Sequence, residues 1–139
     1  MPDTTTRAQE IRASTKLALS PTAIMYVREV DAHLDANTSQ PYRDEPLAGH
    51  WARVTKVCEE AGEVWAALSK LTGENPRKGV CGTEDELLGE LGDTAMAAMC
   101  AIQHLTKDAG RTQAVLAAAI NKAADRVARH AAANGRNGS

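Results

Sequence analysis

One stretch decides the fold: residues 51–72 read WARVTKVCEEAGEVWAALSKLT. Its apolar side chains recur every three or four residues, which is the spacing of one face of an α-helix. They are Val54, Val57, Ala61, Val64, Leu68 and Leu71. Gly73 follows directly, and glycine commonly stands just beyond the last turn of a helix. The stretch therefore predicts a long amphipathic helix that ends at Gly73.

Another helix is predicted upstream of this one. Ser20 precedes Pro21, an arrangement typical of a helix N-cap followed by a proline in the first turn. Apolar side chains follow at helical spacing, namely Ala23, Val27, Val30 and Leu34. We therefore expect a helix over about residues 21–36. The polar segment 37–46, NTSQPYRDEP, is expected to be a loop.

A third helix is predicted after the turn residues NPRKG and Cys81-Gly82. Thr83 with Glu86 three residues later forms a capping box, so the helix is expected to begin there. Between Leu91 and Ile102 the sequence is apolar or small on nearly every side, which is typical of a helix that is buried all round. This helix is therefore expected at the centre of a bundle.

Gly110 and Thr112 are expected to separate the third helix from a fourth. The fourth helix has an apolar stripe, formed by Leu116, Ala119, Ala123 and Val127, and a charged stripe, formed by Lys122, Asp125, Arg126 and Arg129. Strand patterns do not occur. The sequence thus predicts an all-α, four-helix bundle-like fold, and its alanine-rich core is small enough that oligomerisation is expected to complete it.

The composition fits one small domain. With 139 residues and 14.8 kDa there is room for a single core, expected over residues 20–131 between a flexible extension (1–19) and a flexible tail (132–139). The net charge of −2 provides no basic field for a nucleic acid polymer. No apolar run suits a membrane span. Three cysteines without a signal peptide favour a cytoplasmic protein.

Two pairs of acids carry the chemistry. Glu60 and Glu63 lie on the helix that ends at Gly73, and Glu90 and Asp93 lie on the next one; each pair is three residues apart and shares one side of its helix. Either pair alone is typical of a solvated face. Asp93, however, adjoins the stretch expected to be buried, where a carboxylate must be paired or ligated. Four converging acids require cations, and oxygen ligands favour Mg²⁺ or Mn²⁺.

The order of these acids resembles a known signature. EEAGE (59–63) followed by ELGD (90–93) resembles the EExxE and ExxD motifs of the MazG-like all-α nucleotide pyrophosphohydrolases, and residues 51–106 look like that family's core. The resemblance implies a MazG-type fold that works as a homodimer or homotetramer, with sites at the contacts between copies. It also implies Mg²⁺, with Mn²⁺ as a substitute, and its ligands would be Glu60, Glu63, Glu90 and Asp93.

Other residues are expected to assist the acids. Glu59 completes the first motif and lies about 100° around the helix from Glu60, so it is expected to orient water or a neighbouring group. Either Glu59 or Glu63 is expected to act as the catalytic base. The family has a downstream group that contacts phosphates and sugar, and it is resembled by Asn121, Lys122 and Arg126, although a solvated basic face explains these residues equally well.

The remaining candidates have plain structural alternatives. Arg77 and Lys78 are placed to reach a triphosphate, or else belong to an ordinary surface turn. Trp51 and Trp65 are expected to be buried more readily than to stack on a base. Cys58, Cys81 and Cys100 are expected to be small core residues, and the four histidines share no spacing that suggests a site.

The resemblance implies hydrolysis of an NTP or dNTP to the monophosphate and pyrophosphate, a reaction that removes non-canonical or surplus nucleotides. Clustered carboxylates with a metal suit such chemistry, which needs charge neutralisation and positioning. Two alternatives stay open: a related enzyme acting on a specialised nucleotide such as phosphoribosyl-ATP, and a non-catalytic helical interaction protein whose acids are surface residues. A di-iron bundle is disfavoured because its Glu-x-x-His pattern does not occur.

Overall fold

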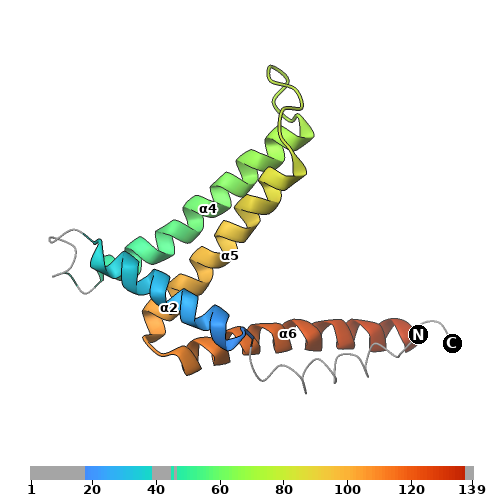
Figure 1. Cartoon of the computed structure of the whole chain (residues 1–139). Coiled ribbons are helices and arrows are strands. Elements are labelled where there is room, and N and C mark those ends of the chain that lie inside the picture. The colour runs from blue at the N-terminus through green and yellow to red at the C-terminus, as the bar shows by residue number, and fades with distance from the viewer. Residues whose placement is uncertain (1–17, 39–44, 46, 137–139) are drawn as a thin grey trace. The chain divides into compact units, whose positions relative to one another are not determined.

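The structure is a computed structural model and describes residues 18–38, 45 and 47–136. Regular structure in these residues is entirely helical, in the order α2 (Pro21–Ala36), α4 (Ala48–Thr72), α5 (Glu84–Thr106) and α6 (Ala109–Arg136) (Figure 1). The expected all-α architecture is confirmed. None of these helices combines the length and the apolar character that crossing a bilayer requires.

The chain divides into two compact units. One, Met25–Lys107, contains α4, α5 and most of α2, and it includes the acids identified above. Of the described residues, the other unit combines 18–24 with 108–136, and it includes α6. The expectation that residues 20–131 form a single domain stays a prediction.

The start and stop signals in the sequence set the bounds of α2, α4 and α5. Ser20 Oγ accepts a hydrogen bond from the Ala23 amide at 3.1 Å, as an N-cap does. Gly73 ends α4 in the left-handed conformation with φ 68°. Thr83 and Glu86 make both hydrogen bonds of the capping box, at 3.2 and 2.9 Å. Of the expected loop over 37–46, residues 39–44 and 46 lie outside the described residues.

α6 begins earlier than expected. Gly110 and Thr112 do not separate it from α5 but lie in its first turn, because Asp108 Oδ1 accepts a hydrogen bond from the Arg111 amide at 2.6 Å and starts the helix there. The helix continues to Arg136, beyond residue 131 where the domain was expected to end. Of the expected flexible extension (1–19) and tail (132–139), residues 1–17 and 137–139 lie outside the described residues.

The covered face of α6 also differs from the expected apolar stripe. Val127 is exposed, whereas Ala117 and Ala124 are buried. The buried Gln113 fixes this face, since its Oε1 accepts from the Leu19 amide at 2.9 Å and its Nε2 donates to the Leu19 carbonyl at 2.7 Å. The covered face of α6 therefore does not coincide with the apolar stripe through Leu116, Ala119, Ala123 and Val127.

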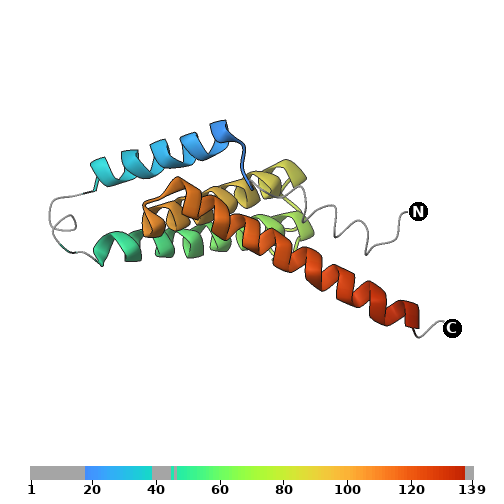
Figure 2. The ribbon, with the colours of Figure 1, turned by 90° about the horizontal axis from the view of Figure 1, so that it is seen from below.

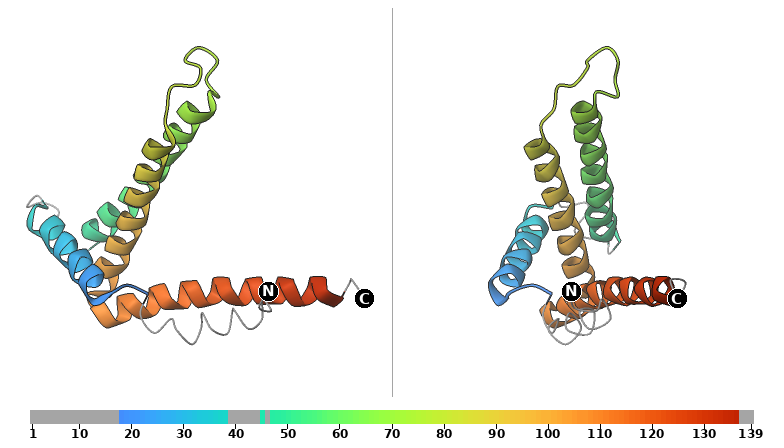
Figure 3. Two further views of the ribbon diagram at one scale, coloured as in Figure 1. Left: turned by 45° about the vertical axis from the view of Figure 1, so that its right-hand side comes forward. Right: turned by 90° about the vertical axis from the view of Figure 1, so that its right-hand side faces the viewer.

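α4 and α5 form an antiparallel hairpin, closed by the loop 73–83 (Figures 1 and 3). The covered positions of α4 recur in steps of three and four, at Arg53, Val57, Glu60, Val64, Ala67 and Leu71. Those of α5 follow the same rule, at Leu87, Glu90, Thr94, Ala97, Ala101 and His104. This is the spacing of two helices packed side by side. We call the two rows the inner seam.

Several residues expected in the core are exposed. Leu88 and Leu91 are 57% and 47% exposed, so α5 is not buried all round in one copy, and Trp51 and Trp65 are 72% and 62% exposed. Among the cysteines only Cys100 is buried, whereas the other two are exposed. The apolar stripes in the sequence cover more than one side of each helix, and the hairpin covers only the inner seam.

Gly73→Ala is expected to destabilise the protein. Its φ of 68° disfavours a side chain, and a Cβ would lie 2.9 Å from Val80 Cγ2 and 3.1 Å from the Val80 amide nitrogen. Urea unfolding should show a loss of about 1–2 kcal/mol. Gly92→Ala is the matched control, because open space surrounds its new methyl group, and it should gain about 0.5–1 kcal/mol. Equal effects of the two substitutions would contradict this account of the turn.

Candidate functional site

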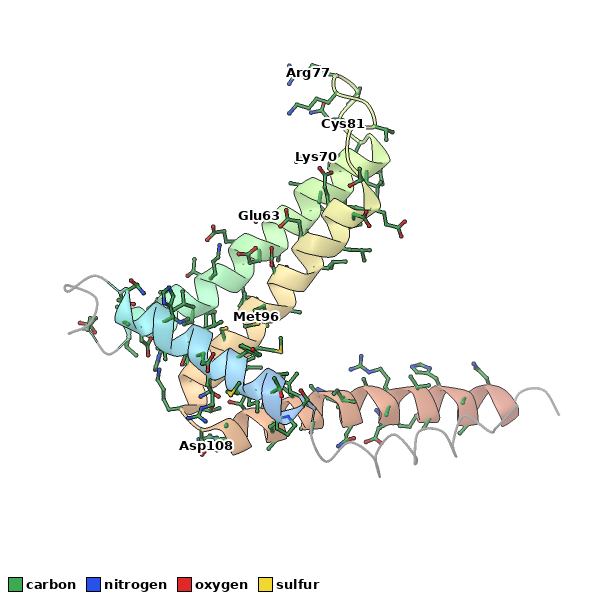
Figure 4. The ribbon with its side chains drawn as sticks, viewed as in Figure 1. Glu63, Lys70, Arg77, Cys81, Met96 and Asp108 are labelled. Carbon is green, nitrogen blue, oxygen red and sulfur yellow. The ribbon has the colours of Figure 1, made fainter. Side chains whose placement is uncertain are left out.

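Three of the four predicted acids converge in the hairpin. Glu60 of α4 and Glu90 and Asp93 of α5 each place a carboxylate oxygen within 4.8 Å of the other two. Glu60 is buried, Glu90 is half-buried and Asp93 is exposed, so the cluster opens to one side. Glu63 extends from α4 beside this cluster (Figure 4). Three oxygens at these separations suit one hard cation such as Mg²⁺.

Lys56 is the cation that faces these acids. Its Nζ lies 2.6 Å from Glu60 Oε1 and 3.1 Å from Glu59 Oε1. The hydrogen bond to Glu60, followed by that to Glu59, raises the pKa of Lys56 and keeps the ammonium charged. Glu59 is thus tied to Lys56 rather than to the cluster. Its expected role in orienting water stays a prediction.

Negative charge is in excess at the cluster. The pKa of Glu63 is raised, first by the charge of Glu60, then by desolvation and by the charge of Glu90, while Lys56 lowers it. Among the described residues, Lys56 is the ion-pair partner of this group, so that one positive charge faces four carboxylates. An arrangement of this kind favours a bound divalent cation.

A cavity of about 350 Å³ adjoins the acids. Its walls are largely apolar, with Val30 and Leu34 from α2 and Met96 from α5, the last of which is labelled in Figure 4. Glu60 and Asp93 line one end. Arg53 and Cys100 line the other, seven residues away on each helix, which is about 10 Å along the helix axes. The cavity thus combines a polar end next to the acids with an apolar body.

The structure also brings together a second polar cluster, which was not expected from the sequence. Asp31 and Asp35 of α2 meet His104 of α5 closely enough to share a cation. Two cations already balance the two carboxylates. Arg53 Nη2 lies 2.8 Å from Asp35 Oδ1, and Lys107 Nζ lies 2.9 Å from Asp35 Oδ2. Because its charges cancel, this cluster is an ion-pair network that ties α2 to the hairpin.

The pKa shifts of Asp35 and His104 are consistent with an ion-pair network. Burial raises the pKa of Asp35, but the hydrogen bond and charge of Lys107, together with the charges of His104 and Arg53, outweigh burial and leave it lowered. Burial, and then the charge of Lys107, lowers the pKa of His104, so that its neutral ring accepts a hydrogen bond from Lys107 Nζ at 2.9 Å. The signal in the sequence was the helical spacing of Asp31 with Asp35 and of His104 with Lys107.

None of the predicted substrate-binding residues is among those that line the cavity. Arg77 and Lys78 are exposed in the loop 73–83, and Figure 4 shows Arg77 at the far end of the hairpin from Met96, with Glu63 between them. The other three, Asn121, Lys122 and Arg126, belong to α6 in the other compact unit; Lys122 and Arg126 are exposed, and Asn121 is half-buried. The phosphate-binding and sugar-binding roles expected of all five residues stay predictions.

Comparisons with known proteins identify no relative: no family model, no curated protein and no solved structure matches the chain. The resemblance to the MazG-like enzymes therefore rests on the motif residues alone. The geometry and charge of the site are therefore the basis for the proposed function.

Glu63→Gln should stabilise the protein when divalent ions are absent. A carboxyl group with a raised pKa binds its proton more tightly in the folded state, so the free energy of unfolding falls as the pH rises from the ordinary value of 4.5 through the raised pKa. The amide removes this dependence. Denaturation between about pH 4 and pH 8 should show a flatter profile for the variant. Glu74→Gln, in the loop after α4, is the control; if both variants kept the wild-type profile, the crowding of carboxylates would be disproved.

Proposed function

We propose that this chain is a Mg²⁺-dependent nucleoside triphosphate pyrophosphohydrolase, which converts an NTP or dNTP to the monophosphate and pyrophosphate. The observation that carries the proposal is the convergence of Glu60, Glu90 and Asp93 within 4.8 Å, with negative charge in excess. A mostly apolar cavity of about 350 Å³ lies directly beside these acids. The two features together supply a place for phosphates and a place for a nucleoside.

The donor set fits Mg²⁺, or Mn²⁺ in its place. The ligands would be Glu60, Glu63, Glu90 and Asp93, all of them carboxylates, which hard divalent cations prefer over softer metals. The balanced network around Asp35 provides the contrast, because there two cations satisfy two acids. Bound Mg²⁺ would neutralise phosphate oxygens and stabilise the charge that develops on the leaving pyrophosphate.

The protein's own groups have separate tasks in this reaction. Glu63, which extends from α4 beside the acids, would accept the proton of the attacking water. The water oxygen bonds to the α-phosphorus, the bond from that phosphorus to the bridging oxygen breaks, and pyrophosphate leaves. Lys56 lines the cavity next to Glu60 and offers its ammonium to an anionic oxygen, and Glu59 positions Lys56 through their ion pair.

The cavity supports a mononucleotide as the substrate. Its volume lies at the small end of the range of about 300–1,000 Å³ that is typical of ligand pockets. Val30, Leu34 and Met96 present apolar surface on which a base can pack, and the acids at one end are placed for phosphates. By the family resemblance, two or four copies would assemble, and Asn121, Lys122, Arg126, Arg77 and Lys78 would contribute contacts to the nucleotide.

Glu60→Gln and Asp93→Asn should each lower the rate of hydrolysis by more than about 100-fold, which corresponds to about 2.7 kcal/mol of transition-state stabilisation. Each amide keeps the shape of the side chain and removes a charged ligand.

Chromatography of wild-type reactions with a panel of canonical, modified and phosphoribosyl nucleotides should show a monophosphate and pyrophosphate. Glu74→Gln controls for loss of surface charge. A diphosphate with free phosphate among the products, or near-normal rates in both variants, would refute the proposed reaction.

Mg²⁺ should raise the melting temperature of the wild-type protein. A ligand that binds only the folded state adds roughly 2.7 kcal/mol at a hundredfold excess over its Kd. Relief of the repulsion among the acids contributes to the affinity for the cation and is therefore included in this figure. Scanning calorimetry with and without Mg²⁺ tests the site without any substrate, and Asp93→Asn should show a smaller shift than Glu74→Gln. Equal shifts in these two variants would place the cation elsewhere.

A further inference from the structure

A charged side chain, Arg53, lines the cavity at the end that lies away from the acids. The described residues that line the cavity include three other charged side chains, Lys56, Glu60 and Asp93. Glu60 and Asp93 stand at the opposite end, and Lys56 is paired with Glu60 at 2.6 Å. The proposed reaction assigns tasks to these three residues and none to Arg53.

The register of the hairpin fixes how far Arg53 lies from the acids. α4 and α5 run antiparallel and lie side by side along their lengths (Figure 2). Seven residues back along α4 lead from Glu60 to Arg53, and seven residues forward along α5 lead from Asp93 to Cys100. Each step covers about 10 Å. Arg53 and Cys100 therefore form a second level of the same cavity, about two helical turns from the acids.

Two carboxylates hold Arg53 in place, yet part of its guanidinium has no partner. The residue is 8% exposed; its Nε donates to Asp31 Oδ1 at 3.4 Å, and its Nη2 donates to Asp35 Oδ1 at 2.8 Å. Two further N–H groups belong to Nη1. No hydrogen bond joins Nη1 to the residues that the structure describes. A buried donor of this kind gains free energy when a ligand supplies an acceptor.

The groups at this level of the cavity are donors rather than acceptors. Of the described residues, Asp31 and Asp35 line a separate pocket that also includes Lys107, and not this cavity. Cys100 is buried, and its burial, followed by the charge of Asp31, raises the pKa of its thiol. The thiol therefore stays protonated at neutral pH, and its sulfur is only a weak acceptor. A ligand that reaches this level meets N–H donors.

The proposed reaction sets which part of a nucleotide reaches Arg53. With the phosphates at Glu60 and Asp93, the sugar follows, and the base extends along the apolar body of the cavity. The part of the base farthest from the phosphates then carries position 4 of a pyrimidine or position 6 of a purine. The group at this position is a carbonyl oxygen in uracil, thymine, guanine and hypoxanthine, and an amino group in cytosine and adenine.

We propose that Arg53 selects nucleotides whose base carries a carbonyl oxygen at this position over nucleotides that carry an amino group there. Nη1 donates a hydrogen bond to the carbonyl oxygen, as arginine does to O6 of guanine in DNA recognition. An amino group would bring two donors together next to an apolar wall, which costs more than the loss of a single hydrogen bond. This inference rests on the proposed function, because binding of the phosphates at the acids is what orients the base.

Pairs of substrates that differ in this group test the selection. ITP differs from ATP, and UTP from CTP, by a carbonyl in place of the amino group. With Mg²⁺ and the wild-type protein, kcat/KM should be at least about tenfold higher for ITP than for ATP, and for UTP than for CTP. Equal values within either pair, or a preference for the amino base, would overturn the proposal.

Binding measured without hydrolysis separates this inference from the proposed reaction. In titration calorimetry with Mg²⁺, IMP should bind at least about tenfold more tightly than AMP, and UMP than CMP. A protein that shows this preference but hydrolyses no triphosphate would refute the proposed reaction and leave the selection by Arg53 standing. Equal affinities, or no binding of any of the four monophosphates, would refute the selection.

Arg53→Gln tests the residue itself, because an amide offers an acceptor as well as a donor. The preference of ITP over ATP should fall to within about threefold. If Arg53 were only structural, both rates would fall together and their ratio would stay at the wild-type value. Lys107→Gln is the matched control, since Lys107 pairs with Asp31 at 3.5 Å and with Asp35 at 2.9 Å but does not line the cavity. This variant should retain the wild-type ratio, and a loss of preference equal to that of Arg53→Gln would contradict the assignment.

Discussion

The inner seam between α4 and α5 places ionisable side chains where packed helices usually carry apolar ones. Arg53 and Glu60 on α4, and Glu90 and His104 on α5, occupy positions of the same three-and-four repeat as Val57 and Ala101. A charge at such a position is tolerated only when a partner satisfies it, since desolvation otherwise outweighs the packing gained. The rest of the unit is arranged around the satisfaction of these charges.

Two clusters of ionisable side chains lie along the hairpin, and their charges are balanced in different ways. In one cluster the positive charges of Arg53 and Lys107 balance the carboxylates of Asp31 and Asp35. These ion pairs hold α2 against the hairpin, so that α2 forms one wall of the cavity. At Glu60, Glu90 and Asp93, Lys56 is the one cation of the described residues that faces the acids, and the raised pKa of Glu63 reflects the excess of negative charge. Residue type alone does not distinguish these two acidic clusters. The number of nearby cations does distinguish them, and it favours the cluster of Glu60, Glu90 and Asp93 as the proposed metal site.

Local signals in the sequence were sufficient to predict the bounds of three helices and the convergence of three of the four acids. Ser20, Gly73 and Thr83 act within a turn of their own positions, so the bounds of α2, α4 and α5 follow from short patterns. The pairs at Glu60 and Asp93 meet because the helices that carry them are consecutive and antiparallel. The start of α6 was mispredicted because Asp108 is a stronger start signal than Gly110 is a stop signal.

Sequence patterns did not predict the contacts between residues that are distant in the sequence. Tertiary packing brings together Asp31 of α2, Arg53 of α4 and Lys107, which follows α5, and no spacing rule connects residues so far apart in the sequence. The apolar residues of α4 were read as a single stripe, although they belong to two rows on different sides of the helix. A period of about 3.5 residues fits both rows, so periodicity shows that a helix packs without showing how many neighbours it has.

Repulsion among Glu60, Glu63 and Glu90 opposes the packing of α4 against α5, whereas burial of Val57 and Ala101 in the inner seam favours it. The apolar positions of the seam therefore hold the acids close together without a cation. A preformed cluster would bind the proposed metal more tightly than one that must first be assembled, because packing has already met the cost of ordering the ligands. The same two helices thus provide both the apolar packing and the charged groups of the proposed site.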